Sequence, residues 1–430
     1  MAEWRTDYWE PNLSAPGKRE RMGGKYSFYV PDFLAEVNLK ISRSLDRELI
    51  RVERQLRELS DVEGADDLAH VARFLLRSEA IASSQMEGIT PAPKQVALAE
   101  LGEQEDIRGI SDAAQLVARN MTAVQRASSV LSNKDRVTPS DLEDLQESLL
   151  GDKTQGLGIR QAQNWIGRSF YHPIGADYVP PDPSLVSDLV RDLAEYIDGA
   201  KHGAVVQAAL VHAQFETIHP FADGNGRVGR ALIHTVLARR GLTPKRVLPV
   251  SLVLATLSHE YVRALTEYRY VGDVNSSEAH RAREQWIKFF ARSVSTAVQQ
   301  ALELNEELSR LRLEWTEKIE EYRSQQGKTK KLRADSATMR ILNRLPGTPI
   351  LTIKTTQDIH GLKPTPARSA LEDLRQADVL VRQSINAASK AYVAQDVLDL
   401  ITYAERQLAS TQFDTRVSLP NRPVPARPER

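Results

Sequence analysis

The residues with the clearest chemical potential lie in one stretch, HPFADGNGRVGR, at positions 219–230. Helical periodicity predicts that one helix ends near Ile218 and that another begins near Asn225 or Gly226. The polar groups of the stretch therefore gather at the start of a helix, where backbone N–H groups are exposed and the helix dipole is positive. This position favours an anionic ligand.

The side chains of this stretch suit phosphate chemistry. Glycines on both sides of Asn225 let successive N–H groups converge on an anion. Arg227 and Arg230 lie three residues apart on one helix face, and their forked donors match phosphate oxygens. Asp223 can hold Mg²⁺, which binds through one or two carboxylates plus phosphates. His219 can act as a general base near neutral pH. Each feature alone is common in structural positions, but together they predict phosphate transfer on a nucleotide.

Composition narrows the class of protein. The chain has 430 residues, an apolar share of 41% and equal numbers of basic and acidic residues, 57 each. This is ordinary globular composition, with length for about three domains. Cysteine is absent, which excludes disulfides, cysteine nucleophiles and thiolate metal sites. The mixed-charge N-terminus and the short apolar runs predict no secretory signal and no membrane contact, so we expect a cytoplasmic protein.

Periodicity and breakers predict a mainly α-helical chain. Residues 1–29 show no periodicity and are expected to form an ordered arm or loop. Proline-rich residues 168–183 suggest a small hairpin. Ser140 and Glu143 form a capping-box pattern at the start of one helix. The predicted helices are 33–59, 66–83, 141–149, 184–198, 204–218, 226–240 and 282–325.

The pattern His-x-Phe-x-Asp-Gly-Asn-Gly-Arg-x-x-Arg resembles the signature of Fic-domain proteins, and residues 219–230 match it at each position. The resemblance implies an all-helical Fic core with a small β-hairpin flap just before the motif, where a target segment would add as a strand. It also implies adenylyl transfer from ATP, as co-substrate, to a Ser, Thr or Tyr hydroxyl of a target protein.

The resemblance also implies a role for each motif residue. His219 takes the proton of the target hydroxyl, and Asp223 holds Mg²⁺ between the α- and β-phosphates. Arg227 binds near the β-phosphate and Arg230 binds the γ-phosphate. Phe221 anchors the loop in the core. The anion hole is formed by Gly224, Asn225 and Gly226.

A second segment, SSQMEG at 83–88, resembles the Fic inhibitory motif Ser/Thr-x-x-x-Glu-Gly/Asn. Its place before the core is that of the class with an N-terminal inhibitory helix, and Ser83 and Glu87 take the motif's fixed positions. The resemblance implies that Glu87 pairs with Arg230 and takes the place of the γ-phosphate. From the residues alone, Glu87 is equally an exposed carboxylate at a helix end. Some proteins of this class also remove AMP, and the sequence does not separate the two activities.

Residues 335–400 read as helix, strand, helix, turn, helix and hairpin, which resembles a winged helix. DNA contact would place Thr365, Arg368 and Arg375 near a groove. Glu372 and Asp373 keep that face from being strongly basic, so protein contact or dimer formation is favoured slightly over DNA contact. The proline-rich tail from residue 411 is expected to be disordered.

These observations predict four regions. They are an N-terminal helical region with the inhibitory motif (1–110), a catalytic core with the following long helix (111–325), a winged helix (332–409) and a tail (411–430). The function expected is autoinhibited protein adenylyl transfer. The alternatives are an enzyme that removes AMP or uses another nucleotide, and a DNA-binding regulator whose Fic core senses nucleotide. The candidate partners are a target protein, a second copy of the chain and DNA.

Overall fold

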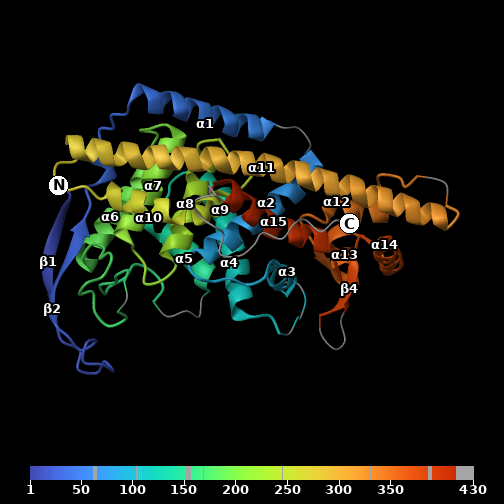
Figure 1. The fold of residues 1–430 in the computed structure, drawn as a ribbon, viewed down its shortest axis with the longest axis horizontal. Helices are drawn as coiled ribbons and strands as arrows, with labels where there is room; N and C mark the ends of the chain where they lie inside the picture. Colours follow the sequence, from blue (N-terminus) through green and yellow to red (C-terminus); the bar gives the residue numbers. More distant parts are fainter. Residues whose placement is uncertain are drawn as a thin grey trace. The chain divides into compact units, whose positions relative to one another are not determined.

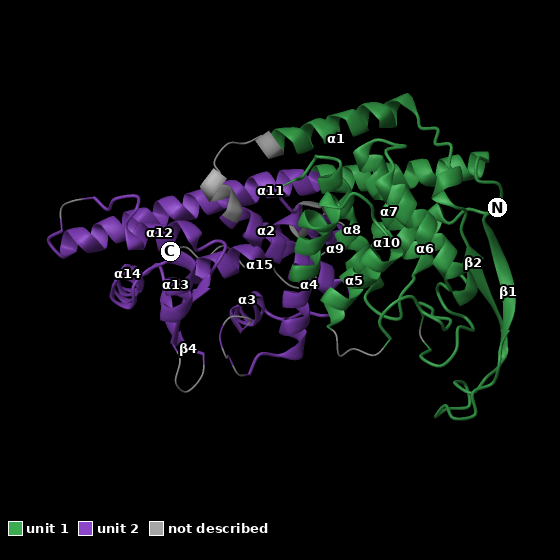
Figure 2. Ribbon diagram, turned by 180° about the vertical axis from the view of Figure 1, so that it is seen from behind, with its two compact units in different colours: residues 1–60, 122–245, 258–295 green, residues 61–121, 246–257, 296–430 purple. Residues whose placement is uncertain are grey.

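The computed structural model describes residues 1–61, 65–102, 105, 107, 109–151, 156–167, 169–244, 246–328, 331–385 and 390–412. The described chain is mainly α-helical with two small antiparallel sheets, as predicted (Figure 1). It divides into two compact units, each built from three separate segments (Figure 2). Unit 1 comprises residues 1–60, 122–245 and 258–295, and unit 2 comprises residues 61–121, 246–257 and 296–430.

The helices and strands are distributed between the two units. Unit 1 holds β1 (Glu3–Trp9), β2 (Gly24–Val30), α5 (Pro139–Leu150), α6 (Pro183–Asp198), α7 (Ala204–Ile218), α8 (Asn225–Arg239), α10 (Ser258–Tyr268) and the 3-10 turns Leu34–Glu36 and Leu131–Asn133. Unit 2 holds α2 (Ala65–Gln85), α3 (Pro93–Gly102), α9 (Val250–Thr256), α12 (Ala337–Arg344), β3 (Ile350–Leu351), α13 (Ile353–His360), α14 (Pro364–Gln376), β4 (Val381–Ser384), β5 (Lys390–Val393) and α15 (Gln395–Gln412). The chain passes between the units five times: at the end of α1 (Arg43–Asp61), within α4 (Asp112–Ser129), before and after α9, and within α11 (Ser277–Gln325).

Helix α7 is the centre of unit 1. All of its residues are buried, which is expected of a helix that is apolar on every side. It packs against α6, α8 and α10. Gly229 of α8 allows the close approach to α7, because a Cβ there would lie 2.5 Å from Glu216 Oε1 and 3.0 Å from Phe215 Cδ1. The two helices that flank the motif are therefore held against each other in the core.

The expectation of an arm or loop over residues 1–29 was wrong. Strands β1 and β2 form an antiparallel hairpin, in register from Glu3 with Val30 to Trp9 with Gly24. Tyr26 and Phe28 alternate with exposed residues and pack with Val179. The prediction failed because a loop rich in Pro and Gly separates two short aromatic strands, and no local period links them.

Two further predictions need correction. The capping box at the start of α5 is formed by Thr138 and Asp141, not by Ser140 and Glu143, because Pro139 takes the first helical position. Of the segment expected as a hairpin, the described residues pair only through a β-bridge to the residues just before it, in which Ile166 and Tyr178 exchange N–H···O bonds of 2.8 and 3.0 Å. Helix α15 continues through Gln412, and the rest of the predicted tail, 413–430, lies outside the described residues.

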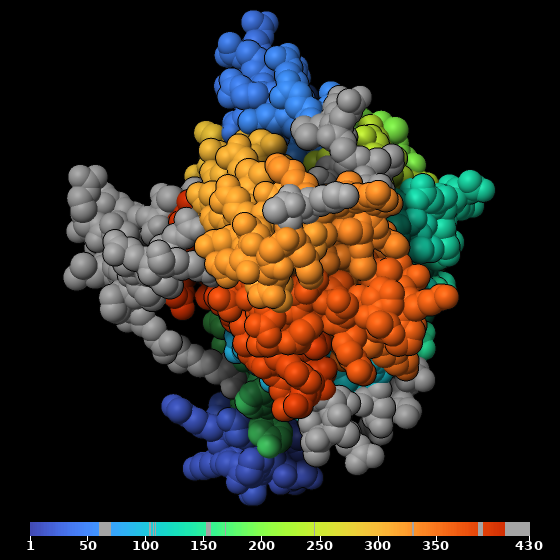
Figure 3. All heavy atoms as spheres, turned by 90° about the vertical axis from the view of Figure 1, so that its right-hand side faces the viewer, coloured from blue at the N-terminus to red at the C-terminus, as the bar shows by residue number. Residues whose placement is uncertain are grey.

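The C-terminal part of unit 2 has the predicted order of helix, strand, two helices and two strands. Its three strands form an antiparallel sheet in the order β3-β5-β4. Side-chain caps begin two of its helices, since Ser336 accepts the N–H of Met339 and Thr352 accepts the N–H of Thr355. Trp315 of α11 donates to Asp396 of α15 at 3.0 Å. The end of α11 therefore packs next to the C-terminal elements, and both are visible side by side on the face shown in Figure 3. In the described part of the chain, we found no helix that combines the length and apolar character of a membrane span.

A buried histidine in α7 gives a first prediction. His212 is fully buried, its Nε2 lies 3.0 Å from the Tyr261 hydroxyl, and its ring stacks on Trp286. Burial lowers the pKa of His212 to about 3. We expect its imidazole to stay neutral from pH 7 to pH 5, which histidine NMR would show as a signal that does not shift, assigned by its loss in His212→Gln.

The same depressed pKa makes stability depend on pH. The unfolded chain protonates this histidine near pH 6.5, whereas the folded chain does so near pH 3. Folding stability should therefore fall as the pH drops from 6.5 to 4.5, by up to about 3 kcal/mol from this group. A His212 signal that titrates near pH 6.5 would contradict this account.

Candidate functional site

The loop between α7 and α8 begins with an unusual backbone. His219 caps the C-terminus of α7 with φ 48° and ψ 59°, in the left-handed region where glycine is usual. A side chain in that region costs about 1–2 kcal/mol. Among the described residues other than glycine, only His219 and Asp378 have positive φ. Strain of this kind persists where neighbouring groups hold it and is frequent at functional sites.

Two residues fix the shape of the loop from within. The Asn225 side chain accepts the Phe221 N–H at 2.9 Å and donates to the Phe221 carbonyl at 2.7 Å. The Phe221 ring is fully buried and lies edge-on to Phe215, with centroids 5.8 Å apart. Phe221 is thus the anchor that the sequence predicted, and the Asn225 side chain is occupied in folding the loop back on itself.

The start of α8 offers backbone donors. Gly224 is the N-cap, with φ 87°, and a Cβ there would lie 3.0 Å from Leu149 Cδ2. Its own N–H donates to Asp223 Oδ1 at 2.6 Å. Helix geometry leaves the next N–H groups, at Asn225 and Gly226, without an intrahelical acceptor. The helix therefore begins where the sequence predicted, and the binding of an anion there stays a prediction.

The charged side chains of the motif cluster at the same end of α8. Arg227 and Arg230 are 3% and 2% exposed, in the first two turns of the helix. Asp223 is 69% exposed, and its Oδ1 lies 3.4 Å from Arg227 Nη2. Two buried guanidinium groups at the positive end of a helix concentrate positive charge. This arrangement suits a polyphosphate better than an uncharged ligand.

Known proteins share this part of the chain. Residues 136–237 match the model of the Fic/DOC family. A probable protein adenylyltransferase of Aquifex aeolicus is 44% identical over 69 residues, which are 16% of this chain and 22% of that protein. A protein adenylyltransferase of Caenorhabditis elegans is 27% identical over 171 residues, 35% of this chain and 32% of that protein. The chain contains a Fic domain.

The fold extends the likeness beyond the Fic domain. The crystal structure of a Fic family protein from Desulfovibrio desulfuricans covers 83% of this chain and 98% of its own, with a TM-score of 0.51 and 20% identity. The similarity to sequence relatives spans about a quarter to a third of their length. This chain therefore shares its fold with that Fic family protein.

The Fic domain has one side chain, Asp223, that suits the coordination of Mg²⁺. Asp223 offers an exposed carboxylate beside the buried arginines. Within the described ranges, no three His, Asp or Glu side chains gather as a metal cluster. Mg²⁺ in nucleotide sites is held mostly by phosphate oxygens and water, with one or two carboxylates. A single exposed carboxylate beside Arg227 is compatible with Mg²⁺ that arrives with a nucleotide.

Three polar residues of the Fic domain site were not predicted. Arg160 and Asn164 donate to the carbonyls of His219 and Phe221, each at 2.9 Å. Gln146 donates to the Asp223 carbonyl at 2.9 Å and accepts the Gly158 N–H at 2.8 Å. Arg160 and Asn164 lie in a loop and Gln146 lies in a helix. The side chains of all three bind backbone atoms of other residues. No spacing in the sequence distinguishes them.

The segment that resembles the inhibitory motif ends α2. Ser83 is buried in the last turn, and Glu87 is exposed in the turn that follows. The Glu87 N–H donates to the Ser84 carbonyl at 3.0 Å, and Gly88 has φ 77°, so Gly88 is the helix stop that the sequence predicted. Glu87 lies in unit 2 and Arg230 in unit 1, and their pairing stays a prediction.

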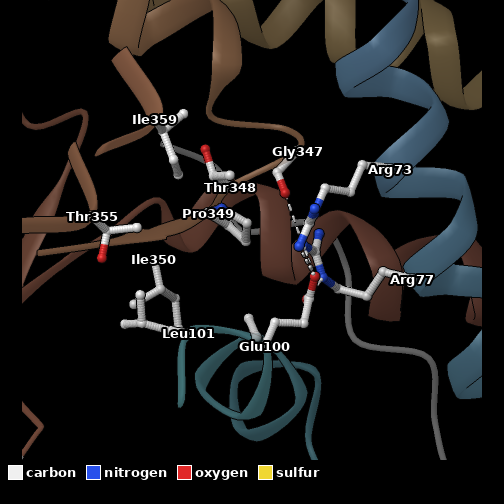
Figure 4. A pocket seen from close by; sticks show the side chains of 11 residues that line it. Arg73, Arg77, Glu100, Leu101, Gly347, Thr348, Pro349, Ile350, Thr355 and Ile359 are labelled. Carbon is white, nitrogen blue, oxygen red and sulfur yellow. Dashed lines mark hydrogen bonds and ion pairs between the residues drawn. The ribbon is translucent and has the colours of Figure 1, made fainter. Parts of the chain in front are cut away.

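A small cavity in unit 2 is a second candidate for a site (Figure 4). Arg77 is buried and donates through Nε to Glu100 at 2.6 Å and through Nη2 to the Gly347 carbonyl at 2.9 Å. Arg73 donates to the same carboxylate at 3.0 Å. The cavity volume is about 30 Å³, room for about one water. Arg77 is bonded to the Glu100 carboxylate and to the carbonyls of Pro346 and Gly347, so we read the feature as a joint between α2, α3 and residues 346–347.

The role of Asn225 in the loop can be tested by stability. Asn225→Ala removes both bonds to the buried Phe221 backbone and should cost about 1–3 kcal/mol. Denaturant unfolding followed by tryptophan fluorescence suits this test, because four of the five tryptophans lie in unit 1. The control is Asn133→Ala, an exposed asparagine that donates to the Ser129 carbonyl, expected within about 0.5 kcal/mol of wild type. Equal losses in both variants would refute the assigned role.

Proposed function

We propose that this protein is an autoinhibited protein adenylyltransferase that moves AMP from ATP to a Ser, Thr or Tyr hydroxyl of a target protein. The observation that carries the proposal is the complete motif loop. It combines His219 at the end of α7 with two buried arginines and backbone donors at the start of α8. The named adenylyltransferases that match this region support the choice of donor.

The reaction follows from these groups. The target hydroxyl oxygen bonds to the α-phosphorus of ATP, its proton passes to His219, and the bond to the β-phosphate oxygen breaks to release pyrophosphate. The backbone N–H groups of Asn225 and Gly226 would face the phosphates, whereas the Gly224 N–H is held by Asp223. Arg227 and Arg230 would orient the β- and γ-phosphates. Asp223 would hold Mg²⁺, which supplies charge neutralisation on the phosphates. In phosphoryl transfer, catalysis is mainly positioning and electrostatic stabilisation.

The autoinhibition proposal concerns Glu87 and Ser83. A carboxylate paired with Arg230 would occupy the place of the γ-phosphate and prevent a productive ATP pose. Support comes from the position of Glu87 in a defined turn at the end of α2, with Ser83 buried one turn earlier. In this proposal residues 1–110 form the regulatory region and 111–325 the catalytic core.

The C-terminal region, 332–409, is proposed to be a winged helix. The order of its elements and of its strands supports this. Arg375 donates to Glu372 through Nε at 2.8 Å and Nη2 at 2.6 Å. That pair leaves fewer cations on the helix that would enter a groove, so protein contact is favoured over DNA contact.

Label transfer tests the reaction. Glu87→Gly protein with Mg²⁺ is incubated with ATP labelled on the α- or the γ-phosphate. We expect protein-bound α-label only, because the bond that breaks lies between the α-phosphorus and the β-phosphate oxygen. Adding His219→Ala should lower the rate by about 10²–10⁴ while ATP binding, measured by calorimetry, is retained. Bound γ-label would indicate kinase chemistry, and full activity without His219 would rule out this base.

The inhibitory role of Glu87 has a separate test. Glu87→Gly should raise auto-modification and target labelling at least tenfold over wild type, because it removes the competitor for the γ-phosphate site. Glu10→Gly, at an exposed loop glutamate of unit 1, is the matched control and should behave as wild type. Equal activity in Glu87→Gly and wild type would refute the brake. Loss of bound label on adding wild-type protein would assign AMP removal to Glu87.

A further inference from the structure

Arg160 is a buried cation whose acceptors are backbone carbonyls. Its side chain is 5% exposed, and within the described residues it takes part in no ion pair. Its guanidinium donates to the carbonyls of Ala162 at 3.2 Å, Pro181 at 2.5 Å, Ile218 at 3.5 Å and His219 at 2.9 Å. Burial lowers the pKa of Arg160 to about 10. A buried charge without a counter-ion is costly, so the position calls for a reason beyond packing.

The acceptors include the end of the helix that carries the proposed base. The carbonyls of Ile218 and His219 are at the negative end of α7, where a cation is favourable. The Arg160 N–H also donates to the Pro220 carbonyl at 2.9 Å, and Ile159 forms a β-bridge with Phe221. Arg160 thus contacts three consecutive residues of the chain, 218–220, from one side.

This contact bears directly on the direction of the His219 side chain. The His219 N–H is fixed by the Phe215 carbonyl at 2.8 Å, and its carbonyl is fixed by Arg160 Nε at 2.9 Å. Both peptide groups next to its Cα are therefore held, which sets the Cα–Cβ direction in a left-handed conformation that a histidine does not otherwise prefer. Asn164 assists with a longer bond of 3.4 Å to the same carbonyl.

We infer that Arg160 is a positioning residue for the Fic reaction: its guanidinium holds the C-terminal carbonyls of α7 so that the His219 imidazole is aimed at the hydroxyl to be deprotonated. This inference rests on the proposed function, in which His219 is the base. Arg160 itself touches no reacting atom. It acts only through the backbone of residues 218–220.

A matched control separates positioning from general stability. Arg239 also binds carbonyls in unit 1, those of Lys134 and Asp135, together with Asp198 at 2.9 Å. It lies at the far end of α8 from the motif loop. Arg239→Met therefore removes an arginine that, like Arg160, binds backbone carbonyls. Unlike Arg160, it does not contact the His219 carbonyl.

The kinetic experiment uses the full chain with Glu87→Gly. Arg160→Met should lower kcat for AMP transfer about 10–100-fold, because small misplacement of a catalytic group costs about 10², while KM for ATP stays within about threefold. Arg160→Lys should recover part of kcat. In a His219→Ala background, Arg160→Met should add no further loss, since it acts through His219. Arg239→Met should lower the melting temperature and leave kcat within about twofold of its parent.

A second readout does not depend on activity. Hydrogen exchange of the peptide that spans residues 216–224 should be faster in Arg160→Met and unchanged in Arg239→Met. Unchanged exchange, or a loss in kcat that is equal in both variants, would overturn the inference. If the Glu87→Gly parent itself transfers no AMP, the proposed function fails, and the exchange comparison alone decides whether Arg160 holds His219.

Discussion

The site depends on one constraint: a histidine must hold a left-handed conformation at the junction of two buried helices. His219 reverses the chain after α7, and the turn brings Asp223 and the start of α8 next to it. The energy for this comes from bonds that surround the loop, donated by Arg160, Asn164 and Asn225 to its backbone. The loop backbone is held by these neighbours, Phe221 and Asn225 serve the shape of the loop, and the His219 and Asp223 side chains are not needed for these bonds.

The electrostatics follow from the same junction. The C-terminus of α7 and the N-terminus of α8 meet at the loop, so the negative end of one dipole and the positive end of the other lie on either side of it. The Arg160 guanidinium binds the negative C-terminus of α7. The N–H groups after Gly224 form the positive N-terminus of α8, where an anion is favoured. The two helix ends thus place partial charges of both signs beside the loop, in addition to the charges of the side chains.

The sequence predicted the helices α6, α7, α8 and α11 to within five residues, because each contains many apolar residues at helical spacing or on all sides. It also predicted the loop between α7 and α8, whereas the roles of the motif residues stay predictions. It missed β1 and β2, whose pairing spans a loop with no local signal. It missed Arg160 and Gln146, because their partners are carbonyls that any residue provides. It could not reveal that each unit gathers three segments.

The joint between Arg77, Glu100 and the carbonyls of Pro346 and Gly347 has a practical consequence for anyone who trims this protein. The basic stretch near residue 328 looks like a natural place to cut. Removal of residues 332–430 would strip two acceptors from a buried guanidinium on α2 and expose the carboxylate that it shares with Arg73. We expect α2 to be destabilised in the shortened chain. A gain in its activity could therefore result from the altered α2 as well as from the loss of the C-terminal domain.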